Sequence, residues 1–200
     1  ATIALGVFII NYFVVLYGGS DTVAAYGVAM RIEQLALLPT IGLTVAVLTI
    51  AGQNFGAKNL NRIIEVGKKA TIYGVAIMLL GTLIIVPLAP WLISLFDSSS
   101  TVVEAGTRYL RIEAFAFTTY IFLNVCVSIL QGIKKPKFGM YIGIYRQIIP
   151  IGIFYLFGTI FGMGILGVWW GIVLINWSAV IISIVYTRTQ LKKLEVEFDS

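Results

Sequence analysis

The segment from Thr22 to Lys58 is a long apolar stretch that carries charges in its interior. Arg31 and Glu33 interrupt it, and its apolar character stops at GQNFGAK, where basic residues begin. About 20 apolar residues are enough to span the hydrocarbon core of a bilayer. The segment therefore predicts a transmembrane helix over residues 22–56. Its charges indicate a functional site, because ionised side chains are costly inside a membrane.

The whole chain is too apolar for a soluble domain. Of its 200 residues, 59% are hydrophobic and 12% are charged, whereas a typical soluble domain has about 25% charged residues. The apolar runs are continuous and do not alternate with polar residues, which argues against a membrane β-barrel. The composition predicts an all-α, polytopic membrane protein.

Turns and charged loops divide the chain into six apolar spans. We expect an amphipathic connector at the membrane surface over residues 59–69 and a charged tail over residues 187–200. Because the chain opens directly on apolar sequence, we expect it to be a piece of a longer polypeptide. The expected membrane helices cover residues 1–18, 22–56, 70–96, 102–133, 138–161 and 165–186.

The basic residues gather at one set of helix ends. Cytoplasmic loops carry an excess of Lys and Arg, so the distribution predicts a multi-pass protein of the plasma membrane, a bacterial or archaeal inner membrane, with its C-terminus in the cytoplasm. We expect these residues to face anionic membrane lipids and not nucleic acid. Ten lie at the predicted cytoplasmic ends and two at the opposite ends: Lys58, Arg62, Lys68, Lys69, Lys134, Lys135, Lys137, Arg188, Lys192 and Lys193, against Arg108 and Arg111.

A stripe of polar and aromatic residues follows the predicted helix 102–133. Its spacing of four, three, four, four and three residues places all of its members on one helical face. Such a face turns towards another helix or a water-filled cavity, because unpaired polar groups do not face lipid. We expect Glu113 to have a cavity or ion role, and the amides and hydroxyls to have either such a role or one in helix packing. The stripe consists of Glu113, Phe117, Tyr120, Asn124, Ser128 and Gln131.

Five further polar residues inside spans are candidates. Arg31 and Glu33 are two residues apart, so they point to opposite sides of their helix, and Gln34 shares the face of Arg31. We expect one of the two charges to bond to a neighbouring helix, or to form a structural ion pair. Arg146 either lines a cavity or snorkels to the headgroups, and Asn11 is a buried amide.

Nothing in the chain indicates an enzyme. It has no histidine and one cysteine, Cys126, so it offers no cluster with metal-ligand spacing. No Gly-rich loop resembles a phosphate-binding Walker A motif. The sequence therefore predicts no metal site and no cofactor, and transport is the function that fits.

Several segments together resemble the second lobe of multidrug and toxic compound extrusion (MATE) transporters. AYGVAMRIEQLALLPTIGLTVAVLTIAGQNFGAKN resembles the second helix of that lobe. RYLRIEAFAF, followed by LQGIKKPK, resembles the next inward-running helix and its loop. YRQIIPIGIFYLFGTIFGMGILGVWWG resembles the last helix pair. The order and spacing of these segments carry the resemblance over nearly all of the chain.

The resemblance implies that six transmembrane helices form one lobe of a twelve-helix transporter. Family members export cationic, amphipathic drugs in exchange for sodium ions or protons, so the implied partners are an N-terminal six-helix lobe and small cationic organic substrates. Some branches place acidic residues where this chain has Asn11 and Tyr120, and others use an aspartate of the N-terminal lobe. Glu33 and Glu113 are the remaining candidates for a coupling site in this chain.

Two questions stay open at this point. A lipid-linked oligosaccharide or lipid flippase of related fold is the alternative function, since Arg31 and Arg146 would suit a pyrophosphate group. The coupling ion is sodium or a proton. Between the carboxylates we expect Glu113 to matter more, because Glu33 has apolar helical neighbours, which favours a structural ion pair for it.

Overall fold

The computed structural model describes the backbone of residues 2–199 and the side chains of residues 5–198. The first residue of the predicted span 1–18 and the last of the predicted tail lie outside the described residues. Within residues 2–199 the chain contains helices and no strand, which confirms the all-α fold. The elements are α1 (Thr2–Gly56), α2 (Leu60–Ser94), α3 (Ser100–Glu113), α4 (Phe117–Gly132), α5 (Lys137–Tyr155), the π-helix η1 (Leu156–Ile160) and α6 (Ile165–Asp199).

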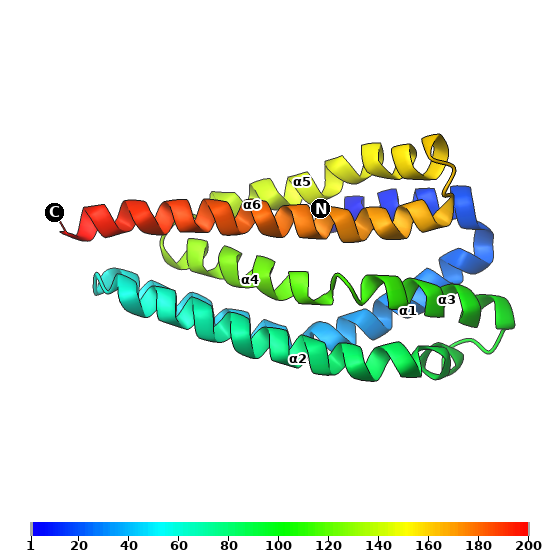
Figure 1. The fold of residues 1–200 in the computed structure, drawn as a ribbon, viewed down its shortest axis with the longest axis horizontal. Coiled ribbons are helices and arrows are strands. Elements are labelled where there is room, and N and C mark those ends of the chain that lie inside the picture. The colour runs from blue at the N-terminus through cyan, green and yellow to red at the C-terminus, as the bar shows by residue number, and fades with distance from the viewer. Residues whose placement is uncertain (1, 200) are drawn as a thin grey trace.

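Helix α1 is two membrane helices joined at a sharp turn. Gly19 has φ 72° and ψ −174°, a backbone conformation outside the helical region, and glycine adopts positive φ without the steric cost of a Cβ atom. Figure 1 shows the chain reversing its direction within α1, from dark blue to light blue. Gly19 lies between the first two predicted spans, 1–18 and 22–56. Because the chain reverses there, α1 contributes two membrane passes.

The predicted helix 102–133 is broken into α3 and α4. The two helices meet at an angle of 50°. At the break the N–H groups of Phe115 and Ala116 bond to the carbonyls of Ile112 and Glu113, at 3.1 Å and 2.7 Å. These bonds span three residues and tighten the backbone, as in a 3₁₀ turn. The expectation of one continuous helix here was wrong.

The described helices are sufficient for six membrane passes. Four of them are long and apolar enough to cross a membrane, and the bent pair α3 and α4 supplies a fifth. Because one of the four is α1, with its two antiparallel parts, the total is six. This architecture confirms the predicted polytopic membrane fold.

Helix α2 begins earlier than the predicted third span. It runs without interruption from Leu60 to Ser94 and so absorbs the predicted surface connector 59–69. Glu65 pairs with Arg62 and with Lys69, both at 2.6 Å, and pairs at these spacings stabilise a helix. The Asn59 side chain also accepts a hydrogen bond from the Arg62 N–H at 3.1 Å. These contacts make the connector a continuation of the membrane helix.

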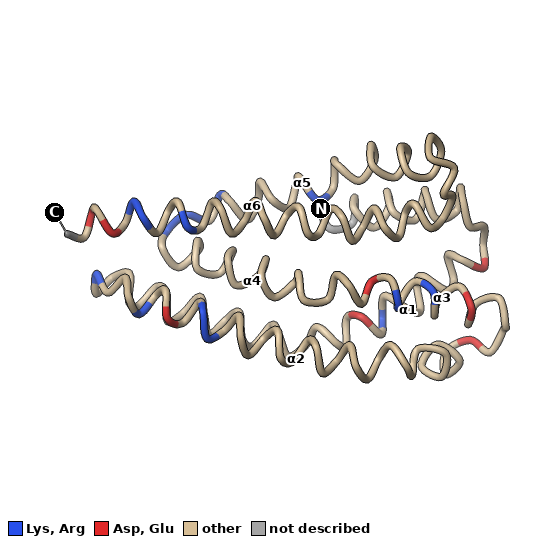
Figure 2. The backbone as a smooth tube through the Cα atoms, viewed as in Figure 1, with Lys and Arg blue, Asp and Glu red and all other residues tan. Residues whose placement is uncertain are grey.

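The predicted tail is also helical. Helix α6 continues to Asp199, because its last turns pack on the bundle. Leu194 is buried there, and the ring of Phe198 lies 5.9 Å from the ring of Phe55 at the end of α1. Most of the lysines and arginines lie towards this end of the bundle (Figure 2).

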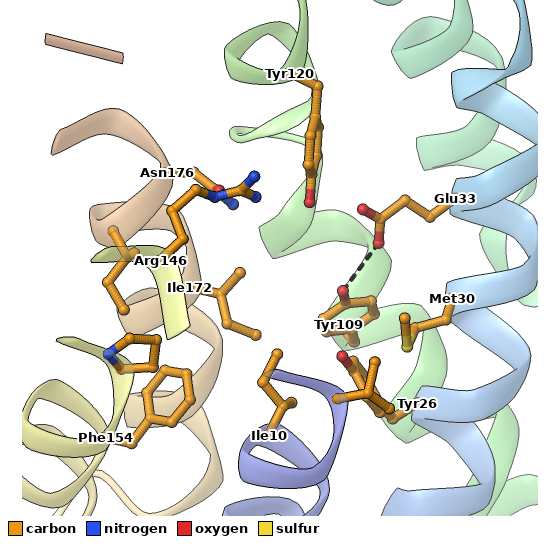
Figure 3. Close-up of a pocket in the computed structure, with 13 residues that line it drawn as sticks. Ile10, Tyr26, Met30, Glu33, Tyr109, Tyr120, Arg146, Phe154, Ile172 and Asn176 are labelled. Carbon is orange, nitrogen blue, oxygen red and sulfur yellow. Dashed lines mark hydrogen bonds between the residues drawn. The ribbon is translucent and has the colours of Figure 1, made fainter. Parts of the chain in front are cut away.

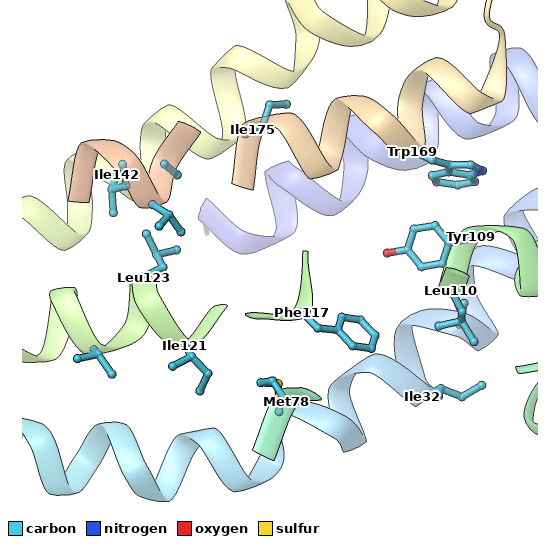
Figure 4. Packing of buried hydrophobic residues seen from close by; sticks show 14 of the residues in the cluster. Ile32, Met78, Tyr109, Leu110, Phe117, Ile121, Leu123, Ile142, Trp169 and Ile175 are labelled. Atoms are coloured by element: carbon cyan, nitrogen blue, oxygen red, sulfur yellow. The ribbon is translucent and has the colours of Figure 1, made fainter. Parts of the chain in front are cut away.

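The core lies where α4 packs between its neighbours. Phe117 and Ile121 of α4 are fully buried, as is Met78 of α2, and Figure 4 shows these side chains meeting between the two helices. Large apolar side chains cover much of the outer surface, as expected for helices that face lipid. The core fixes α3 and α4 against α1, and this arrangement positions the candidate site.

Candidate functional site

A cavity of about 140 Å³ lies within the bundle, between α1 and the helices α3 to α6. Polar side chains enter it from several helices, and Figure 3 shows them pointing towards one another. The candidates Glu33, Tyr120 and Arg146 line it. The full lining is Val7, Ile10, Tyr26, Met30, Glu33, Tyr109, Tyr120, Arg146, Pro150, Phe154, Ile172, Ile175 and Asn176.

Glu33 is a buried carboxylate in the second part of α1. It accepts a hydrogen bond from the hydroxyl of Tyr109 of α3, at 3.1 Å. Arg31 is exposed on the other side of the helix, which confirms that the two charges point apart and that one of them bonds to a neighbouring helix. Among the described residues no ion pair includes Glu33. The structural ion pair expected as an alternative for it was wrong.

Glu113 is the last residue of α3, immediately before the break. It is 1% exposed, and its Oε1 accepts a hydrogen bond from the hydroxyl of Tyr120 at 3.2 Å. Its Oε2 is buried and has no hydrogen-bond partner among the described residues. Glu113 does not itself line the cavity. It therefore presents an unsatisfied carboxylate oxygen inside the bundle, next to a tyrosine of the cavity wall.

The two carboxylates form one electrostatic cluster. The carboxylates of Glu33 and Glu113 lie close enough to repel each other when both are ionised. The hydroxyl of Tyr120 donates a hydrogen bond to Glu113 and lies near Glu33. Figure 3 shows this hydroxyl and the Glu33 carboxylate pointing into the same space. Buried like charges are unfavourable unless a cation or a proton compensates them. The cluster is therefore a place where a cation can be held.

Arg146 of α5 supplies the positive charge on the opposite wall. Its guanidinium donates a hydrogen bond to Oδ1 of Asn176 at 2.7 Å and lies 5.6 Å from the centre of the Tyr120 ring, a cation–π distance. It attracts both carboxylates but forms no ion pair with either of them among the described residues. Arg146 thus points into the cavity, and the snorkelling alternative was wrong.

Three aromatic residues close one side of the cluster. The ring of Tyr109 lies 4.7 Å from that of Trp169 and 5.2 Å from that of Tyr26. Trp169 and Tyr26 stack at 5.6 Å. Sequence reasoning missed Tyr26 and Tyr109 as site residues. The spacing of four between Tyr109 and Glu113 was the available signal, since it places both on one face of α3.

The remaining candidates lie outside this cavity. Gln34 is exposed, like Arg31. Asn124 and Ser128 share the helical face of Tyr120 on α4, but they lie about one and two turns farther along the helix and are not part of the cavity wall. The amide of Asn11 donates a hydrogen bond to the carbonyl of Val7 in its own helix, at 3.0 Å. No group of three or more acidic, Cys or His side chains able to hold a metal occurs in the described part of the chain.

Known proteins resemble the chain along most of its length. Residues 1–156 match the model of the MatE family. The probable multidrug resistance protein NorM of Mesorhizobium japonicum is 28% identical over 196 residues, which cover 93% of this chain and 41% of that protein. The NorM protein of Pseudomonas syringae pv. tomato is 25% identical over 178 residues, which cover 86% of this chain and 39% of that protein.

A solved structure agrees with the fold. An outward-facing multidrug resistance MATE family transporter of the MOP superfamily superimposes with a TM-score of 0.92 at 25% identity, over 96% of this chain and 44% of that one. The chain thus spans about 40% of the length of the curated relatives it matches. The match of the family model over more than half of the chain shows that the chain belongs to the MatE family.

Proposed function

We propose that this chain is one lobe of a secondary active antiporter that exports cationic, amphipathic compounds in exchange for sodium ions or protons. Family membership supports transport, and the name of the NorM relatives supports multidrug efflux. The share of the relatives that the chain covers supports a second lobe as its partner. Transporters built from two repeats bind their substrates between the repeats.

The carboxylate cluster is the observation that carries this proposal. Glu33 and Glu113 are buried together, and Oε2 of Glu113 has no hydrogen-bond partner among the described residues. Ionisable side chains inside a membrane bundle typically belong to ion or proton pathways. A sodium ion or a proton that binds here removes the repulsion between the two carboxylates. Its departure restores the repulsion, so occupancy of the cluster can be coupled to a change in conformation.

Tyr120 connects the cluster to the cavity. Its hydroxyl donates a hydrogen bond to Glu113 and lies near Glu33 on one side, and its ring lies beside the Arg146 guanidinium on the other. When a cation neutralises the carboxylates, their attraction for Arg146 weakens. We propose that this weakening lets Arg146 and Tyr120 move, so that the state of the ion site is transmitted to the substrate side of the lobe.

A flux measurement tests the two-lobe proposal. Reconstituted alone in liposomes, the 200-residue lobe should show no ion-driven export of a cationic dye, because alternating access needs two bundles that rock against each other. The full-length protein, reconstituted at the same lipid-to-protein ratio, should export the dye when a sodium or proton gradient is imposed. Strong flux from the lobe alone would contradict the proposal.

Membrane orientation is a separate prediction. We expect Lys58 and Lys135 to face the cytoplasm and Asp97 to face the opposite side, because basic loops stay in the cytoplasm. Single cysteines at these three positions, in a Cys126→Ala background, can be labelled in intact cells with a membrane-impermeant reagent. Only the cysteine at position 97 should react before permeabilisation. Labelling at position 135 in intact cells would show that the predicted orientation is wrong.

A further inference from the structure

An open apolar groove runs along the outside of the bundle, away from the carboxylate cavity. Helices α2 and α6 form its sides and α4 forms its floor, and its volume is about 410 Å³. Its lining consists of Ile64, Gly67, Lys68, Thr71 and Ile72 of α2, Phe122, Val125, Cys126 and Ile129 of α4, and Ile184, Thr187, Arg188 and Leu191 of α6.

The groove has two cationic side chains, one on each wall. Lys68 of α2 and Arg188 of α6 are both exposed, and neither forms an ion pair among the described residues. The two walls belong to helices that are far apart in the sequence and lie side by side here. Their charges are therefore available to one anionic group that sits between the helices.

A buried hydroxyl in the same groove also lacks a partner. Thr187 is 5% exposed, and its Oγ1 has no partner of normal hydrogen-bond geometry among the described residues. The Cys126 thiol lies near it. A buried polar group without a partner costs free energy, so rotation of the Thr187 side chain towards a ligand oxygen beside Arg188 would give this hydroxyl a partner.

The rest of the lining suits a hydrocarbon chain. The side chains of Ile72, Phe122, Ile129 and Ile184 cover the wall and the floor with apolar surface. Gly67 of α2 lets the floor helix α4 pack closely against α2, since a Cβ atom at position 67 would lie 2.7 Å from Cδ1 of Ile129. A cationic substrate would be repelled by the two basic side chains, whereas an anionic amphiphile matches both parts of the groove.

We propose that this groove binds an anionic glycerophospholipid. Its phosphate lies between Lys68 and Arg188, a headgroup or ester oxygen accepts a hydrogen bond from Thr187, and one acyl chain lies along the apolar floor. The site is separate from the carboxylate cavity and does not depend on which ion drives transport. Its position at the basic end of the bundle agrees with the attraction of such clusters for anionic lipids.

Native mass spectrometry of the full-length, delipidated protein tests this proposal. With equal amounts of phosphatidylglycerol and phosphatidylcholine added, the protein should retain phosphatidylglycerol in preference by about tenfold or more, since each basic group near the surface contributes measurably to anionic lipid binding. Lys68→Gln combined with Arg188→Gln should abolish the preference, whereas Lys68→Arg combined with Arg188→Lys should keep it.

The matched control uses two basic residues of the same helix outside the groove. Lys192→Gln combined with Lys193→Gln removes the same net charge from α6 without touching the lining, and the preference should persist. Equal retention of the two lipids by the unmodified protein overturns the proposal, and this comparison needs no variant. An equal loss of preference in the two glutamine double variants overturns it as well, because it would show a general surface effect.

Discussion

Replacing Glu113 by glutamine should lower ion-driven transport by the full-length protein about 10- to 100-fold. Glutamine keeps the size of the side chain and removes its charge, so the site loses the oxygen that has no other partner, Oε2. Hydrogen bonds and contacts to a charged group contribute about 1.5–3 kcal/mol, and 1.4 kcal/mol corresponds to a tenfold change. The measurement is dye export from proteoliposomes with an imposed sodium or proton gradient.

Glu33→Gln should also reduce transport, to a smaller extent. Its carboxylate lines the cavity but already accepts a hydrogen bond from Tyr109, and the glutamine carbonyl can still accept that bond. Tyr120→Phe tests the connection between the carboxylates, because it removes only the hydroxyl that bonds to Glu113 and lies near Glu33. We expect this variant to bind substrate and to lose its response to the ion gradient.

Glu104→Gln is the matched control for the carboxylate variants. Glu104 lies on the same helix as Glu113, but it is exposed and pairs with Arg108 at the surface, at 3.3 Å. Surface pairs of this kind contribute little, so transport should be unchanged. All variants are compared at equal expression and thermal stability. If Glu113→Gln transports normally while Glu33→Gln fails without unfolding, the two carboxylates have the opposite roles.

The sequence predicted the spans because span length and loop charge are local properties. Six passes and the turn at Gly19 follow from runs of apolar residues separated by polar ones. The break between α3 and α4 has no such signal, since AFA at residues 114–116 is an ordinary apolar stretch. Hydrogen bonds across three residues and the packing of Phe117 against α2 produce it.

The site was predicted in part, because a helical stripe identifies a face but not its partner. Tyr120 and Arg146 line the cavity, while Asn124 and Ser128 do not, because a stripe does not show how far along a helix a cavity extends. The apolar neighbours of Glu33 along its helix favoured a structural ion pair for it. Its partner Tyr109 lies 76 residues away in the sequence, so only the fold reveals the contact. The greater importance of Glu113 stays a prediction.

Gly132→Ala should destabilise the protein, because this glycine lies directly against α1 and leaves no room for a Cβ atom. A Cβ atom at position 132 would lie 2.8 Å from Cβ of Ala51 and 3.0 Å from the backbone nitrogen of Gly52. Backbone atoms cannot rotate away as a side chain can, so the helices must separate. Overpacking of this kind costs about 1–3 kcal/mol, and small residues at helix crossings typically serve to prevent it.

Gly52→Ala is the control for this contact, because the two glycines face each other but are not equivalent. A Cβ atom at position 52 would have its nearest contact at 3.8 Å, with the carbonyl oxygen of Gly132, an ordinary distance. Alanine also favours a helix by up to about 1 kcal/mol over glycine. We therefore expect the apparent melting temperature of the detergent-solubilised protein to stay the same or rise with Gly52→Ala, and to fall by several degrees with Gly132→Ala.

Transport should fall together with stability in the Gly132→Ala protein. Helices α1 and α4 also carry Glu33 and Tyr120, two side chains that line the same cavity, so a change in the packing of these helices should reach the site. We expect separation of α1 from α4 to move Glu33 away from Tyr120, so coupling to the ion should weaken even at temperatures where the variant remains folded. Gly52→Ala should keep both properties. A Gly132→Ala protein that melts no lower than the Gly52→Ala protein would show that the two helices can separate at this crossing without cost.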